Sequence, residues 1–239
     1  MRRYALSASV AVVLLVLTLA ALWSLLAPVR SAIESFAEES IRVARFRPPA
    51  SFAAPTPDVQ AECRIACRNH HEVAHLPYLP RQLFEDNQLG DLTHAWYSNL
   101  LCAMGEPPLS PPAPNNRRIR FLWHRSFHPA ISVRIERAAG AASLIATETS
   151  DPIGGAVTRQ GEIRLSVEQM DSIDSAVASL GYWSLPATEA PEGMDGATWI
   201  LEISDADRYH FVTRWNGGEL ESIGRELLAL SELDPSPIY

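Results

Sequence analysis

The residues best suited to chemistry form an H-E-x-x-H sequence made by His71, Glu72 and His75. Histidines four residues apart share one face of a helix and can both bind Zn²⁺, while the intervening glutamate can act as a base toward the metal-bound water. The candidates for a third ligand are Glu85, Asp86, Asp91 and His94. The pattern thus suggests a zinc hydrolase, but Pro77 stops a helix directly after His75. The alternative interpretation is a polar helix surface without a metal.

Cysteines add a second pattern to the same segment. Four residues spaced by four form one stripe: Cys63, Cys67, His71 and His75. They cannot all bind one ion on a straight helix, because its ends lie about 18 Å apart at 1.5 Å per residue. Two neighbours could still hold a structural metal together with Cys102 or His94. A disulfide from Cys63 or Cys67 to Cys102 is the interpretation we favour, and it leaves a third cysteine for intermolecular pairing.

A third group mixes charged and aromatic residues near the C-terminus. Its members are Asp195, Trp199, Glu202, Tyr209, His210, Arg214 and Trp215. Because side chains alternate between the two faces of a strand, we expect Glu202, His210 and Arg214 to line one solvated sheet surface. Trp199 and Trp215 should point to the opposite side, into the core. The charged surface is either a binding face or an ion-paired outer face.

The elements that must position these residues begin with two helices. Thr56 and Pro57 start a helix that we expect to run to about His75, because proline is favoured at the first helical position. A second helix is expected near Asp91–Met104, so residues 56–104 are interpreted as a helical hairpin that carries the cysteines and histidines. Five prolines then fall within residues 105–116. This composition is typical of a semi-rigid linker.

From residue 117 onward the pattern predicts an α+β domain over residues 117–233. Apolar and polar residues alternate as in half-buried strands near 117–123, 131–135, 144–147, 161–165, 198–203 and 208–215. Ser166 and Gln169 form a capping box that starts a helix ending at Gly181. A last helix is expected over Glu219–Leu230. This order predicts an antiparallel sheet with helices on one face.

The N-terminus indicates where the chain resides. Residues 4–29 are uncharged and long enough to span a bilayer. Arg2 and Arg3 precede this stretch, so the positive-inside rule places them in the cytoplasm and the body outside it. We therefore favour an uncleaved transmembrane signal anchor over residues 1–30, with a cleaved signal peptide as the alternative, and we expect a stalk over residues 31–55. In a bacterium this makes a single-pass inner-membrane protein with a periplasmic body.

Charge excludes one class of partner. The chain has 28 acidic residues and 20 basic ones, all of them arginine, for a net charge of −8. An acidic body repels nucleic acid, so no nucleic-acid partner is expected. The chain also contains no G-x-S-x-G elbow, Walker loop or G-x-G-x-x-G sequence, and no cofactor is expected.

Two short sequences carry a resemblance to other proteins. They are D-G-A-x-W-I-L-E at residues 195–202 and Y-H-x-V-x-R-W at residues 209–215. Within the stretch 131–233, they are similar to a signature of proteobacterial envelope proteins of unknown function. The resemblance implies an α+β fold and an envelope location, and it carries over no catalytic residue.

Together these features predict a membrane-anchored periplasmic binding or scaffolding module. Its expected partners are the inner membrane, through residues 4–29, and an envelope protein. The alternative is a membrane-tethered zinc metallohydrolase that uses His71, Glu72 and His75. A thiol-redox role of the three cysteines is the third interpretation.

Overall fold

The computed structural model describes residues 53–69, 72–84, 88–112, 116–138, 140–188, 193, 195–233 and 235–238. The predicted anchor and nearly all of the predicted stalk lie outside these residues. All described elements belong to one compact unit, residues 48–239. No helix among the described residues combines the length and the apolar character needed to cross a membrane.

Two helices open the unit, as the sequence predicts. They are α2 (Pro57–Asn69) and α3 (Gln88–Ala103), with the short 3₁₀ helix η2 (Arg81–Leu83) between them. α2 ends at Asn69 and not near His75, so the predicted C-terminal end of this helix is wrong. The backbone beyond it bonds to α3 instead. The amide of Ala74 donates to Asn99 Oδ1 at 2.9 Å, and Asn99 Nδ2 donates to the carbonyl of Glu72 at 2.8 Å.

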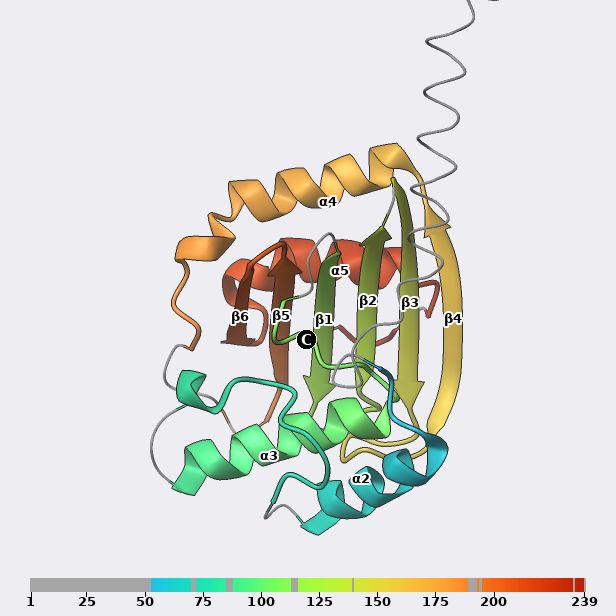
Figure 1. Ribbon diagram of the computed structural model, residues 1–239, viewed down its shortest axis with the longest axis vertical. Helices are drawn as coiled ribbons and strands as arrows, with labels where there is room; N and C mark the ends of the chain where they lie inside the picture. Colours follow the sequence, from blue (N-terminus) through green and yellow to red (C-terminus); the bar gives the residue numbers. More distant parts are fainter. Residues whose placement is uncertain are drawn as a thin grey trace, which may run out of the picture. The chain divides into compact units, whose positions relative to one another are not determined.

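Six strands form one antiparallel sheet, which confirms the predicted α+β class. The strands are β1 (Arg117–Arg125), β2 (Ile131–Ala138), β3 (Ala141–Thr149), β4 (Val157–Leu165), β5 (Ala197–Asp205) and β6 (Arg208–Trp215). Their order in the sheet is β4-β3-β2-β1-β5-β6 (Figure 1). β1 is therefore an interior strand that pairs with β2 on one side and with β5 on the other.

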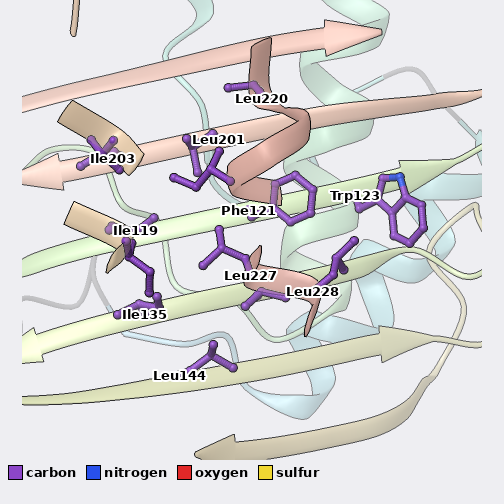
Figure 2. Packing of buried hydrophobic residues seen from close by; sticks show 14 of the residues in the cluster. Ile119, Phe121, Trp123, Ile135, Leu144, Leu201, Ile203, Leu220, Leu227 and Leu228 are labelled. Carbon is purple, nitrogen blue, oxygen red and sulfur yellow. The ribbon is translucent and has the colours of Figure 1, made fainter. Parts of the chain in front are cut away.

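One face of the sheet packs against the two later helices, α4 (Val167–Ser179) and α5 (Glu221–Leu230). We call it the helix face. The predicted capping box is present, because Ser166 accepts from the Gln169 amide while the Gln169 side chain accepts from the Ser166 amide. Leu227 and Leu228 of α5 lie over the apolar side chains of β1 (Figure 2). Gly224 lets α5 approach closely, because a Cβ there would meet the Trp199 ring at 2.4 Å.

The other face packs against the helical hairpin, and we call it the hairpin face. Leu122, Ile200 and Phe211 point from β1, β5 and β6 into a second apolar cluster. The helices contribute Cys63, Cys67, Tyr97, Leu100 and Leu101 to that cluster. The two helices of residues 117–233, α4 and α5, thus cover one side of the sheet, as predicted, and the hairpin helices α2 and α3 pack on the other side. A single sheet is shared by two cores.

The faces of the β6 residues differ from the predicted ones: Trp215 pairs with Thr198 and so lies on the side of Glu202, opposite Trp199. Trp199 pairs with Arg214, and Glu202 pairs with Phe211. Directly paired residues share a face, so His210 and Arg214 lie on the helix face with Trp199, and Glu202 lies on the opposite face. The physical reason is the short turn between Asp205 and Arg208, which pairs odd-numbered residues with even-numbered ones.

The proline-rich segment between α3 and β1 is packed along much of its length. Residues 106–109 are buried, although their composition suggested a linker. The carbonyls of Pro107, Pro108 and Leu109 all accept hydrogen bonds from arginines of β1. Prolines cannot donate a backbone hydrogen bond, but their carbonyls are good acceptors, and here they satisfy buried guanidinium groups.

Candidate functional site: a buried polar cluster on the hairpin face

The H-E-x-x-H sequence does not form a helical metal site in the described residues. Glu72 and His75 follow the end of α2 in non-helical backbone, and His71 lies outside the described residues. The zinc-binding arrangement needs both histidines on one helical face. The candidate ligands Glu85 and Asp86 also lie outside the described residues. Within the part that is described, no three His, Cys, Asp or Glu side chains are grouped closely enough to hold a metal ion.

The two remaining candidate ligands make other contacts. The His94 ring bonds through Nε2 to the Leu79 carbonyl at 2.8 Å, and burial lowers its pKa. Asp91 accepts from Arg81 Nε at 2.7 Å. Both side chains thus connect α3 to the segment that precedes it.

Two of the cysteines form the predicted disulfide between the hairpin helices. Cys63 is joined to Cys102 with an S–S distance of 2.02 Å, which resolves the choice of partner for Cys102 and confirms the disulfide. Cys67 keeps a free thiol that is fully buried. Burial raises its pKa to about 12, and the charge of Asp151 adds to the effect. A thiol in this environment is a poor nucleophile, because the thiolate is the reactive form.

The third predicted group is divided between the two faces of the sheet. His210 bonds to the Leu185 carbonyl at 2.9 Å, and Arg214 donates to Glu219 at 2.7 Å, both on the helix face. Asp195 is exposed in the loop before β5. Glu202 is fully buried on the hairpin face, so the predicted solvated surface carrying Glu202, His210 and Arg214 is wrong.

Glu202 instead belongs to a buried polar cluster. We define this cluster by its five members: Glu106, Arg120, Arg134, Glu202 and Tyr209. Arg120 Nε donates to Glu202 Oε2 at 2.6 Å, and the Tyr209 hydroxyl donates to Glu202 Oε1 at 2.7 Å. Arg134 Nε donates to Glu106 Oε2 at 2.8 Å, and the same oxygen lies 3.6 Å from Arg120 Nη1. The two carboxylates therefore share Arg120 between them.

Burial determines the electrostatics of the cluster. Arg120 and Glu202 are both 0% exposed, and Glu106 is 1% exposed. Burial raises the pKa of Glu202, and the positive charge of Arg120 and the Tyr209 hydroxyl oppose that rise. Burial also disfavours the charge on Arg120, but Glu202 and Glu106 more than offset this and raise its pKa. The pKa of Tyr209 rises well above its usual value because of burial and the adjacent carboxylate, so its hydroxyl stays protonated and donates.

The segment from α3 to β1 covers this cluster. The Pro107 carbonyl accepts from Arg120 Nη1 at 2.7 Å, and the Tyr78 ring lies 5.9 Å from the Arg120 guanidinium. Through these contacts the cluster connects the proline segment, β1, β2, β5 and β6. Its chemical role is to hold these elements together at one position.

Sequence reasoning identified Glu202 and Tyr209 but missed Arg120, Glu106 and Arg134. One signal was present: arginines 118 and 120 alternate with apolar residues along β1, which marks one face of the strand as polar. Alternation alone favours a solvated face, and nothing local indicates that the hairpin covers it.

Comparison with models of known protein families finds no match, and a search of curated proteins finds none either. The resemblance to proteobacterial envelope proteins of unknown function therefore stays a prediction.

Proposed function

We propose that the protein is a membrane-anchored binding or scaffolding module whose body works outside the cytoplasm. The observation that carries the proposal is the Cys63–Cys102 disulfide, because structural disulfides are typical of oxidising, extracytoplasmic compartments. The uncharged stretch at residues 4–29 supplies a segment long enough to anchor such a body.

A binding role is supported by how the chemically capable residues are used. Glu202, His94 and Arg214 are bonded to their own chain, and each connects one element of the fold to another. Side chains that catalyse usually face a cleft and retain a free donor or acceptor for the substrate. The contacts of these three residues favour a rigid body that presents its surface to a partner.

Location is tested with one exposed position. Ile65 is 64% exposed on α2, so Ile65→Cys in the full chain offers a reactive thiol outside the apolar cores. A membrane-impermeant maleimide should label this variant in intact spheroplasts. The same variant lacking residues 4–29 is the control and should be labelled only after lysis. Labelling of the full-length variant only after lysis would contradict the proposed location.

The zinc content of the protein distinguishes a binding module from a zinc metallohydrolase. The full chain, purified in detergent, should contain no stoichiometric zinc by mass spectrometry, because residues 72–75 do not continue α2. One zinc per chain that is lost in His71→Ala would overturn the binding module in favour of a metallohydrolase. His128→Ala is the matched control, because this histidine lies on the β1–β2 loop, outside the H-E-x-x-H sequence.

A further inference from the structure

The two edge strands of the sheet, β6 and β4, differ in whether other segments of the chain cover them. The β6 edge is covered by residues 185–187: the Thr213 amide donates to the Ala187 carbonyl at 2.7 Å, and Arg214 Nη1 donates to the Pro186 carbonyl at 3.1 Å. The Tyr182 hydroxyl also bonds to the carbonyl of His210 in this strand at 2.7 Å. These contacts blunt the edge, as natural sheets commonly do.

The β4 edge has no such cover in the described part of the chain. β4 pairs only with β3, and its residues 158–162 and Arg164 are exposed. The strand is nine residues long and contains no proline. A long strand of this kind presents a row of backbone donors and acceptors that another strand can pair with.

Gly161 in the middle of β4 is evidence that another strand pairs with this edge. Glycine weakens a strand, so a glycine inside a strand usually marks a bulge or a site where another group approaches the backbone closely. The irregularity in the β3–β4 pairing lies at Glu148 and Thr149, away from Gly161, and a Cβ at Gly161 would meet nothing within 4 Å. Nothing in the described fold therefore requires a glycine here.

We propose that β4 pairs with β4 of a second copy of the same chain, antiparallel and with the two-fold axis at Ile163. In this register Ile163 faces its own counterpart and Leu165 faces the partner's Gly161. Leu165 is buried on the helix face and Ile163 packs against the same core, so the apolar row continues from one sheet into the next. Gly161 leaves room opposite the larger leucine.

Charge complementarity selects the same register. Glu162 and Arg164 stand on the opposite face of β4, where with Glu136 and Ser143 they line a shallow hollow. With the axis at Ile163, Glu162 of each copy faces the partner's Arg164, so two opposite-charge pairs form. With the axis at Gly161, Glu162 would face the partner's Gln160, and Ile163 would face the partner's Arg159. Opposite charges directly across a strand pair stabilise it, and this distinguishes the two registers.

An exposed apolar residue lies at the end of this edge. Val167 begins α4 two residues after β4 and is 69% exposed. The proposed pairing brings this end of β4 toward the start of the partner's β4, where Arg159 lies, and the aliphatic part of an arginine can cover a valine side chain. Pairing of one strand per copy is a small interface, so the dimer should form at the high local concentration of a membrane or a concentrated solution.

Cysteine cross-linking of the full chain tests the register. Ile163→Cys places two thiols opposite each other across the axis, and mild oxidation should give a covalent dimer on a non-reducing gel. Thr158→Cys is the control: it is exposed on the same strand, but in this register its position opposite falls beyond the end of the partner's β4. Equal cross-linking of the two variants, or none with Ile163→Cys, would overturn the proposal.

Charge reversal tests the pairs without touching the core. In the Ile163→Cys background, E162R or R164E alone should lower the dimer yield at least five-fold because like charges then face each other. The double variant E162R/R164E should restore the yield, since both reciprocal pairs are re-formed with exchanged signs. Failure of the double variant to recover would refute the register, because all three variants change only exposed side chains. The inference does not depend on the proposed location: maleimide labelling can succeed where cross-linking fails, and the reverse.

Discussion

Neutralising Glu202 should destabilise the protein strongly, because it removes the closer of the two carboxylates that balance the charge of the buried Arg120 guanidinium. Both side chains are 0% exposed and their atoms are 2.6 Å apart, so water cannot replace the lost partner. Breaking such a buried pair from one side typically costs about 3–5 kcal/mol of unfolding free energy. Glu202→Gln, which keeps the shape of the side chain, should therefore lose about 3 kcal/mol or more in urea unfolding of residues 48–239, followed by tryptophan fluorescence.

A second variant separates charge from packing. Arg120→Met combined with Glu202→Leu removes both charges, and with them the desolvation that each one requires, so it should lie within about 2 kcal/mol of the natural protein. The surface pair Arg225–Glu221, about half exposed on α5, supplies the control, and Glu221→Gln should change stability by less than about 1 kcal/mol. A loss below about 1 kcal/mol in Glu202→Gln would refute the reasoning. A double variant as unstable as the single one would show that packing, not the unpaired charge, sets the loss.

Three other perturbations have definite expected results. Burial lowers the pKa of His124 to about 4 from an ordinary value of 6.5, so its contribution to stability is complete above pH 6.5 and is lost as the pH falls. Because of this group, the free energy of unfolding in urea should be about 2 kcal/mol lower at pH 5 than at pH 7, and His124→Gln should remove that part of the difference. Replacing both Cys63 and Cys102 by alanine opens a loop with a sequence separation of 39, which should cost about 4 kcal/mol of unfolding free energy. Equal stability of that variant and the oxidised protein would contradict a stabilising role of the Cys63–Cys102 disulfide. The Cys67 thiol should react with maleimide at pH 8 only in urea, whereas Ile65→Cys on the same helix should react in the folded protein; fast native labelling of Cys67 would contradict its burial.

Local patterns predicted most of the elements because each depends on neighbouring residues. The alternation along β1 and β2 located strands, and the Ser166–Gln169 capping box located the start of α4. The hairpin and its disulfide could also be predicted from the sequence, since a pair of helices with cysteines in an exported chain favours a disulfide bridge. The end of α2 could not be predicted, because Glu72 and Ala74 after this helix bond to Asn99 on α3, 27 and 25 residues away in sequence.

The candidate site could be predicted only in part because it depends on which face of the sheet is covered. Alternation shows that Glu202 and Trp199 point in opposite directions, but it does not show that the hairpin packs on the side of Glu202. The assignment of faces in β6 depended on the parity of the turn after Asp205, which pairs Glu202 with Phe211. Composition was misleading for residues 106–109, whose prolines look like a linker and instead provide acceptors for buried arginines.

The position of β5 has a consequence for the order in which the chain can become stable during synthesis. β1 to β4 follow one another and can pair as they emerge, but the second edge of β1 waits for β5, whose Glu202 lies 82 residues after Arg120. Until then the Arg120 guanidinium has no Glu202 partner, and a chain ending before residue 197 lacks both strands that complete the sheet. The fold closes late, when the last fifth of the chain arrives, so a truncated or stalled product retains an open edge that proteases can recognise.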